Sequence, residues 1–256
     1  MIVLHFRRGI LKAALVSLSL AAILFFGISA SPYIKTVASA GQKPVYAVDR
    51  TDKVIALSFD ASWGAEHTEA LLATLDQYHV KTTFFLVNLW IEEYPDMVKA
   101  IDEAGHEIGL HSATHPHFTE LSPEEMTAEL TQNREALKKI TGKDAAIFRP
   151  PYGDYNDTVI ETVSAQSLTA VQWSVDSLDW KGLSAEEISK RVLEGAAPGA
   201  IVLLHNNGDH TAEALGSILP SLLNSGYKIV PVGEILFHGD SYTDANGIMH
   251  GKDDES

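Results

Sequence analysis

Three histidines follow the apolar run at residues 108–110, at positions 111, 115 and 117. Imidazoles at positions i and i+4 lie on the same side of a helical turn, so His111 and His115 can each direct a nitrogen at one divalent cation, with Ser112 capping the turn. Taken alone, the pair could equally be ordinary polar residues at a strand-to-helix junction. The spacing predicts a site for zinc or a similar metal, and the rest of the chain must decide.

The 256-residue chain contains no cysteine, and 45% of its residues are hydrophobic. Disulfides, thiolate zinc sites and a cysteine nucleophile are therefore excluded, and any metal must be held by histidine and carboxylate side chains. The formal net charge is -15; residues 1–40 hold four basic and no acidic residues, so the remainder holds 15 basic against 34 acidic residues, or -19. This acidity argues against nucleic acid as a partner.

The N-terminal segment places three basic residues ahead of an uncharged run over residues 13–30. This length is close to that of a transmembrane helix, and the basic flank is expected to stay in the cytoplasm, so that the rest of the chain faces outward. Residues 38–40, Ala-Ser-Ala, resemble a signal-cleavage site. We therefore expect residues 1–40 to be a signal or anchor segment with a linker, and the protein to be anchored to the cytoplasmic membrane facing outward or secreted after cleavage.

Beyond this segment, short apolar runs alternate with amphipathic stretches, and two capping boxes, at Ser122 and Ser184, mark the starts of helices. This alternation is typical of repeated βα units around a parallel sheet or barrel. We expect one such domain over residues 41–238, and a polar tail over residues 239–256 that we predict to be disordered. The expected strands are residues 54–59, 82–87, 107–110, 146–148, 170–175, 200–204 and 228–230.

Polar and charged residues follow the expected strands. The carboxyl ends of parallel strands meet at one edge of a sheet or barrel, where functional residues collect. We expect one site to be formed by the residues at these ends, which include Asp60, His111, Arg149, Asp179 and His205.

The order of these residues resembles the NodB-homology polysaccharide deacetylases, carbohydrate esterase family 4, over residues 54–236. The resemblance implies an α/β fold, a distorted (β/α) barrel in a single domain, and metal-dependent removal of acetyl from N-acetylglucosamine-type sugars. The variant F-D-A-S-W-G at residues 59–64, with the apolar N-terminus, is similar to the membrane-anchored, sporulation-associated subgroup of spore-forming bacteria. That similarity implies peptidoglycan as the substrate, with the spore cortex as a candidate. The matching segments are 58–62 (S-F-D-A-S), 111–115 (H-S-A-T-H), 149–152 (R-P-P-Y), 176–180 (D-S-L-D-W) and 203–205 (L-L-H).

Hydrolysis of an amide needs a base for the attacking water, donors for the oxyanion and an acid for the leaving amine. The acid and the base can be assigned from the chemistry of the side chains. Asp60 is the candidate base, and a fork of hydrogen bonds from Arg149 would keep it ionised and oriented. His205, with an ordinary pKa near 6.5, is the candidate acid. Asp179 is the partner expected to raise that pKa and to fix the tautomer of the ring.

The remaining candidates would hold the metal and the acetyl group. A divalent metal, most simply zinc, on His111 and His115 would activate a water molecule and polarise the carbonyl group. By carry-over from the family, the backbone amide of Tyr152 would bind the oxyanion. Trp180 and Leu203 would likewise form the walls of the acetyl pocket.

The chain departs from the family at Ala61, which replaces the second aspartate of the first motif, the third metal ligand of the family. Catalytic zinc usually has three protein ligands, so water, Asp60 or Glu66 would have to complete the shell. Weak metal binding is expected, since losing even a supporting group lowers affinity by ~10–100-fold. Two functions therefore remain: a deacetylase of N-acetylated cell-wall glycan, and a carbohydrate-binding pseudoenzyme. The retained acid–base residues, which a pure binder does not need, favour the enzyme.

Overall fold

The central strand of the fold is β2 (Val54–Ala61), and all eight of its residues are buried. We describe residues 42–251 in a computed structural model, so the predicted anchor segment at residues 1–40 lies outside the described residues. A strand buried on both faces is expected where helices cover a parallel sheet. Ala56 of β2 packs with Ile201 in one core cluster. Leu57, Phe59 and Ala61 point to the other face of the strand and belong to a second, larger cluster, which contains side chains of most of the helices.

The main sheet is eight-stranded, in the order β6-β5-β4-β3-β2-β8-β7, and β9 also pairs with β2. Every pairing is parallel. The consecutive strands β6 and β7 form the two edges, so the sheet curls without closing, which confirms the predicted distorted (β/α) barrel. The strand predicted at residues 170–175 is in fact two strands, because the chain leaves one edge here and joins the other. The bounds are β3 (Thr83–Leu86), β4 (Glu107–Leu110), β5 (Ile147–Phe148), β6 (Thr169–Ala170), β7 (Val175–Asp176), β8 (Ile201–His205) and β9 (Lys228–Val230).

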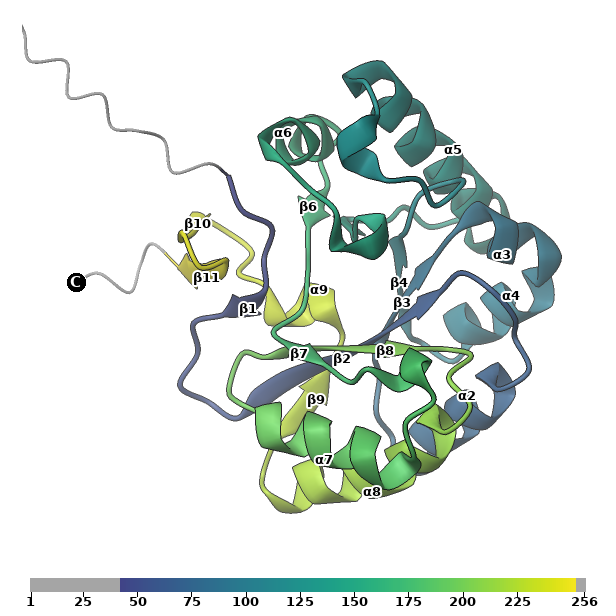
Figure 1. Cartoon of the computed structure of the whole chain (residues 1–256), viewed down its shortest axis with the longest axis vertical. Coiled ribbons are helices and arrows are strands. Elements are labelled where there is room, and N and C mark those ends of the chain that lie inside the picture. Colours follow the sequence, from purple (N-terminus) through teal and green to yellow (C-terminus); the bar gives the residue numbers. More distant parts are fainter. Residues whose placement is uncertain (1–41, 252–256) are drawn as a thin grey trace, which may run out of the picture. The chain divides into compact units, whose positions relative to one another are not determined.

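Helices lie around the outside of the curled sheet (Figure 1). The longest, α5, begins at a complete capping box in which the Glu125 N–H donates to Ser122 and the Ser122 N–H donates to Glu125, and it ends at Gly142 in the left-handed conformation. The capping box predicted at Ser184 is also present, at the start of α7. Within residues 42–251, no helix is both long enough and apolar enough to cross a membrane. The helices are α2 (Thr68–Gln77), α3 (Asn88–Glu93), α4 (Pro95–Glu103), α5 (Pro123–Thr141), α6 (Asp157–Ala165), α7 (Ala185–Gly195), α8 (Thr211–Asn224) and α9 (Val232–Ile235), with short 3-10 turns η1 (Phe118–Glu120), η2 (Pro151–Gly153) and η3 (Asp179–Lys181).

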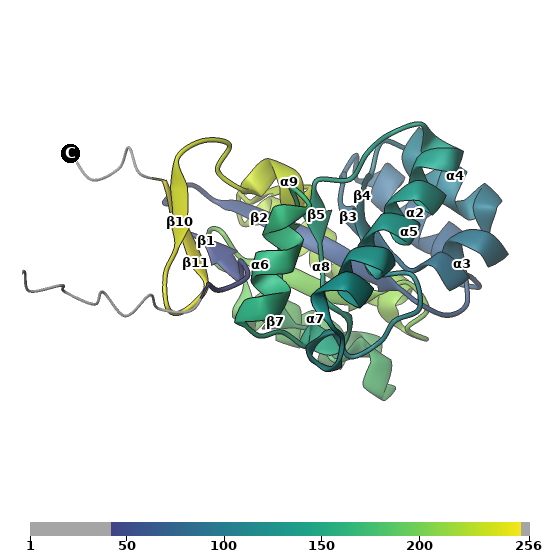
Figure 2. The same cartoon turned by 90° about the horizontal axis from the view of Figure 1, so that it is seen from above.

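A separate three-stranded sheet lies at one side of the barrel (Figure 2). It consists of β1 (Ala47–Val48), β10 (Ser241–Thr243) and β11 (Ile248–Gly251). The prediction that residues 239–256 are disordered is therefore wrong for 241–251. The side chain of Asp244 accepts hydrogen bonds from the N–H groups of Asn246 and Ile248, which turns the chain back on itself, and β11 then pairs with β1.

The segment around β1 bridges the opening between the edges of the main sheet. The Val45 N–H donates to the carbonyl of Ala170 in β6, and the Val48 N–H donates to the Gly199 carbonyl just before β8. The N-terminal segment thereby satisfies backbone groups that an open barrel would leave unpaired.

Candidate active site

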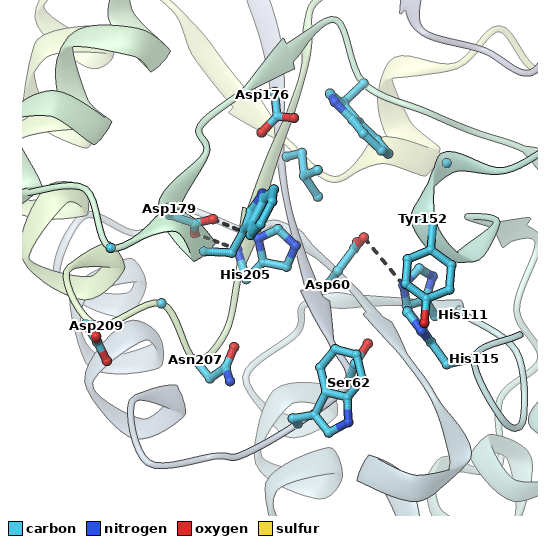
Figure 3. Close-up of a pocket in the computed structure, with 17 residues that line it drawn as sticks. Asp60, Ser62, His111, His115, Tyr152, Asp176, Asp179, His205, Asn207 and Asp209 are labelled. Carbon is cyan, nitrogen blue, oxygen red and sulfur yellow. Dashed lines mark hydrogen bonds and ion pairs between the residues drawn. The ribbon is translucent and has the colours of Figure 1, made fainter. Parts of the chain in front are cut away.

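The strand register brings the two predicted acid–base residues face to face. Asp60 and His205 are paired across β2 and β8, at the carboxyl ends of both strands. Residues directly paired on neighbouring strands point to the same face of a sheet, so both side chains reach one cavity of about 570 Å³. Figure 3 shows Asp60 between His205 on one side and His111 with His115 on the other. Eight of the nine predicted residues line this cavity, and the ninth, Arg149, lies buried beside it.

Asp60 is held by the predicted ion pair. Arg149 Nη1 donates to Asp60 Oδ1 at 2.7 Å, and Arg149 Nη2 donates to Ser58 Oγ and to the Gln172 carbonyl. The guanidinium also lies 4.2 Å from the centre of the Phe85 ring, so it is fixed by packing as well as by charge. Burial has the largest single influence and would raise the pKa of Asp60, but the charge and hydrogen bond of Arg149, together with the neighbouring His111 and His205, outweigh it and the pKa is lowered. Asp60 is therefore ionised and oriented, as a base must be.

His205 has the partner predicted for it. Its Nδ1–H donates to Asp179 Oδ1 at 2.7 Å, and its backbone N–H donates to Asp179 Oδ2 at 2.7 Å. Thr211 Oγ1 donates to the same Oδ2, so both oxygens of the buried carboxylate are hydrogen-bonded. Burial works to lower the pKa of His205, but the hydrogen bond and charge of Asp179 outweigh it and the pKa is raised. Because Asp179 binds Nδ1, Nε2 is the nitrogen that can carry a proton to the substrate.

The loop after β4 brings His111 and His115 together, but not through a helical turn as predicted. Ser112 and His115 both have positive φ, 78° and 60°, which no helix allows. Ser112 still accepts a hydrogen bond from the His115 N–H, and the two imidazole rings lie 5.0 Å apart. Glu129 of α5 orders the loop by accepting hydrogen bonds from the N–H groups of Ala113 and Thr114.

The two histidines carry lone pairs suited to a cation. His111 Nδ1–H donates to the Arg149 carbonyl, so Nε2 holds its lone pair at 3.5 Å from Asp60 Oδ2. His115 Nδ1 is buried without a hydrogen-bond partner. Burial lowers the pKa of both rings, to about 4 for His115, which keeps them neutral. Neutral imidazole is the form that binds metals.

A complete three-ligand site does not fit these residues. Within residues 42–251, no group of three or more His, Asp or Glu side chains is arranged to hold a metal ion. Asp60 is committed to Arg149, Glu66 does not line the cavity, and Ala61 is buried in the core with only a methyl group to offer. The chain thus supplies two ligands of a catalytic zinc site and not the third.

Three further predicted residues form the walls. Tyr152 lies in η2 with φ 60° and ψ 6°, a left-handed conformation that is costly for a residue with a side chain. Its ring stacks on His117 at 4.3 Å and meets His115 edge-on at 4.5 Å. Trp180 and Leu203 line the cavity on the side of His205, with the indole of Trp180 largely exposed. All three line the cavity, and their oxyanion and acetyl-pocket roles stay predictions.

The sequence analysis did not identify Asn133, which supports the site from α5. Its Oδ1 accepts the His111 N–H, and its Nδ2 donates to the carbonyl of Leu86 and to Asn88. A signal was present in the sequence, because Asn133 falls on the buried stripe of α5 with Leu130 and Leu137. A buried amide among leucines is expected only where it has hydrogen-bond partners.

Comparison with known proteins decides the family. The chain matches the polysaccharide deacetylase family model over residues 47–171. It is 36% identical over 180 residues to a peptidoglycan-N-acetylglucosamine deacetylase of Bacillus cereus, covering 69% of this chain and 66% of that protein. A second Bacillus cereus protein with the same description is 34% identical, over 74% of this chain and 91% of its own length. The chain belongs to the polysaccharide deacetylase family.

Enzymes of this family hydrolyse carbon–nitrogen bonds other than peptide bonds and are generally metal-dependent. The present chain spans only part of some of its relatives. The peptidoglycan-N-acetylglucosamine deacetylase of Listeria monocytogenes is 38% identical over 186 residues, which cover 73% of this chain and 39% of that protein. Membership of the sporulation-associated subgroup stays a prediction.

Solved structures with this fold include a protein without activity. The fold matches that of a family 4 carbohydrate esterase pseudoenzyme from Bacillus anthracis with a TM-score of 0.73 and 30% identity, over 81% of this chain and 72% of that one. A variant of that pseudoenzyme with restored enzymatic activity matches with a TM-score of 0.73 and 33% identity, over 75% and 70% of the two chains. Activity in this chain must therefore be argued from its own site residues.

Proposed function

We propose that the protein hydrolyses the acetamide group of N-acetylated amino sugars in a cell-wall polysaccharide, with peptidoglycan as the substrate. The observation that carries this proposal is the facing pair of Asp60, ionised by Arg149, and His205, oriented by Asp179, in one cavity. Two titratable groups with pKa values moved in opposite directions are what acid–base hydrolysis requires. The names of the relatives support peptidoglycan as the polymer.

The chemical step uses side chains that face the cavity. Asp60 takes a proton from a water molecule while the oxygen of that water attacks the carbonyl carbon of the acetyl group. The backbone N–H of Tyr152 donates to the oxyanion that forms. The carbon–nitrogen bond then breaks as His205 Nε2 gives its proton to the leaving nitrogen, which yields acetate and a free amine.

A second function, carbohydrate binding without turnover, is favoured by one observation. Ala61 removes the third metal ligand of the family, and the similar Bacillus anthracis protein is a pseudoenzyme. Such a protein would keep the cavity and its aromatic walls while losing the reaction. The two functions make opposite predictions for the release of acetate.

Acetate release separates the two functions. The full-length protein should release acetate from peptidoglycan, and Asp60→Asn should lower that rate by about 10²-fold or more, because a general base typically contributes ~10²–10⁴. Asparagine retains an oxygen that can accept from Arg149, so it is the mildest change at this position. Binding of the glycan without release of acetate by the wild-type protein would establish the pseudoenzyme instead.

The missing ligand can be tested by replacing Ala61. Ala61→Asp should tighten zinc binding by at least ~10-fold, since residue 61 ends β2 beside Leu86, which pairs with Leu110 just before His111. Isothermal titration calorimetry would compare this variant with Ala61→Asn, which matches it in size but carries no charge. Unchanged zinc affinity together with a lower melting temperature would mean that the new carboxylate is buried in the core, where an unpaired charge is destabilising.

We propose that the protein lies outside the cytoplasmic membrane, held by its N-terminal segment or released from it, with peptidoglycan of the spore cortex as a candidate substrate. The support is the basic flank before residues 13–30 and the F-D-A-S-W-G variant at residues 59–64. Protease added to intact cells that lack an outer barrier should degrade the domain. Protection of the domain until the membrane is broken would show the opposite orientation.

A further inference from the structure

The loop between β2 and α2, residues 62–67, is held by hydrogen bonds from two buried side chains. The carbonyl of Gly64 accepts hydrogen bonds from Trp90 Nε1 at 2.7 Å and from Asn206 Nδ2 at 2.8 Å. Asn206 Nδ2 also donates to Thr68 Oγ1 at the start of α2. Gly64 has φ 64°, a left-handed conformation that residues with a side chain rarely adopt, so the turn favours glycine. The loop is therefore held in one conformation.

This rigid loop presents Trp63 to solvent. Trp63 is 60% exposed, whereas Trp90, which anchors the same loop, is 1% exposed. A tryptophan that served only to cover the barrel would be expected to bury its ring as Trp90 does. The ring of Trp63 instead lines the cavity, with its centre 5.2 Å from that of His115 in an edge-to-face arrangement.

The other walls of the cavity have the same character. Among the described residues, Tyr152 and Trp180 are also exposed by more than half, and both line this cavity. Sugar rings have apolar faces of C–H groups that pack on aromatic rings, while their hydroxyl groups stay hydrated. Three exposed aromatic side chains around one cavity are therefore typical of a carbohydrate-binding groove.

The charge of the cavity limits which sugars can bind in it. Among the residues described, no lysine or arginine lines the cavity. Asp176 and Asp209 line it in addition to the paired carboxylates of Asp60 and Asp179. A sugar ring with a carboxylate would therefore enter a cavity with an excess of acidic side chains, whereas a neutral ring would not be repelled.

We infer that Trp63 is the platform for a second, uncharged sugar ring, next to the N-acetylated sugar that lies over Asp60 and His205. The substrate class is then an oligosaccharide or polymer, and a single sugar would use only part of the site. This inference rests on the proposed function for the position of the reacting sugar. Asn206, the residue after the candidate acid, becomes a positioning residue that holds Trp63 through the carbonyl of Gly64.

Binding measured without turnover tests the platform. Each variant is made in the full-length Asp60→Asn protein, and calorimetry measures the Kd of an N-acetylglucosamine tetramer and of the monomer. Trp63→Ala should raise the Kd of the tetramer by about tenfold, which is about 1.4 kcal/mol, and change that of the monomer by less than about twofold. Trp63→Phe should give an intermediate Kd. Tyr242→Ala removes an exposed aromatic ring outside the cavity and should leave both values unchanged.

Two outcomes would overturn the inference. If folded Trp63→Ala binds the tetramer as tightly as its parent does, Trp63 is no platform. If the Kd values of monomer and tetramer rise equally, Trp63 belongs to the subsite of the reacting sugar. Failure of the proposed function would look different, because the wild-type protein would then bind the tetramer and release no acetate.

Discussion

Strand β4 has a histidine at each end, and the two rings are used in opposite ways. His106 precedes the strand and accepts a hydrogen bond from the Thr82 N–H at Nδ1, so its proton is on Nε2. His111 follows the strand and donates from Nδ1 to the Arg149 carbonyl, so its lone pair is on Nε2. Burial lowers the pKa of both rings. The fold uses the lone pair of His106 internally and presents that of His111 to the cavity.

The same contrast separates the two ends of the sheet. At the amino ends, Glu107 accepts hydrogen bonds from Thr83 Oγ1 and the Gly233 N–H, and it is one of the residues that line a small cavity of about 180 Å³. At the carboxyl ends the cavity is about 570 Å³, and buried polar atoms without partners remain on His115, Arg149 and Asn206. Of these three residues only His115 lines the cavity, so polar groups at the amino ends serve the fold, whereas His115 at the carboxyl ends can face a ligand.

The largest effect is expected at the carboxyl ends. His205→Gln should lower the rate of acetate release by about 10²-fold or more, because glutamine cannot transfer a proton to the leaving amine. The melting temperature should change little, since the Asp179 carboxylate keeps its bonds from the His205 backbone N–H and from Thr211. The rate is measured as acetate released, and the melting temperature by circular dichroism. A large fall in melting temperature with full activity of the folded fraction would make His205 a structural residue.

A smaller effect is expected at the amino ends of the strands, and there the change should lower stability and leave the rate unaffected. Thr83→Val removes a hydroxyl that donates to Glu107 at 2.6 Å and accepts the Val232 N–H at 2.7 Å. The buried N–H left without an acceptor should lower the free energy of unfolding by about 1–3 kcal/mol. Urea denaturation measures this change, and kcat of the folded protein should be unaffected. A loss of kcat at full stability would erase the distinction between the two ends.

The smallest effect is a difference in pH dependence. The pKa of His106 is about 4 in the folded protein, below its ordinary value of 6.5. Above pH 6.5 the ring is neutral in both states; as the pH falls from 6.5 towards 4, the unfolded chain takes up the proton first, so stability is lost. His106→Gln cannot titrate and offers an oxygen to the Thr82 N–H, so its melting temperature should fall less between pH 7 and pH 4. Parallel curves for the two proteins would show that His106 does not contribute to acid sensitivity.

The parts of the site that were predictable from the sequence follow from strand ends and pairing chemistry. The carboxyl end of a buried strand places Asp60 at the cavity, and its charge requires a partner such as Arg149. The loop around Ser112 was not predictable, because its left-handed conformation is accompanied by hydrogen bonds that its N–H groups donate to Glu129 of α5. The exposure of Trp63 depends in the same way on Trp90 and Asn206, which are distant in sequence.

The small sheet has a consequence for the order of folding. Asp49 and His250 contact one another across 201 residues of sequence, and β1 pairs with β11 beside them. Contacts of such long range close slowly, because the entropy of the intervening chain opposes them until the rest is ordered. During synthesis, β1 can be held in place by β11 only after residues 248–251 have emerged. A chain shortened before residue 241 should then have a barrel whose opening is loosely closed, and it should be more readily cleaved by proteases there.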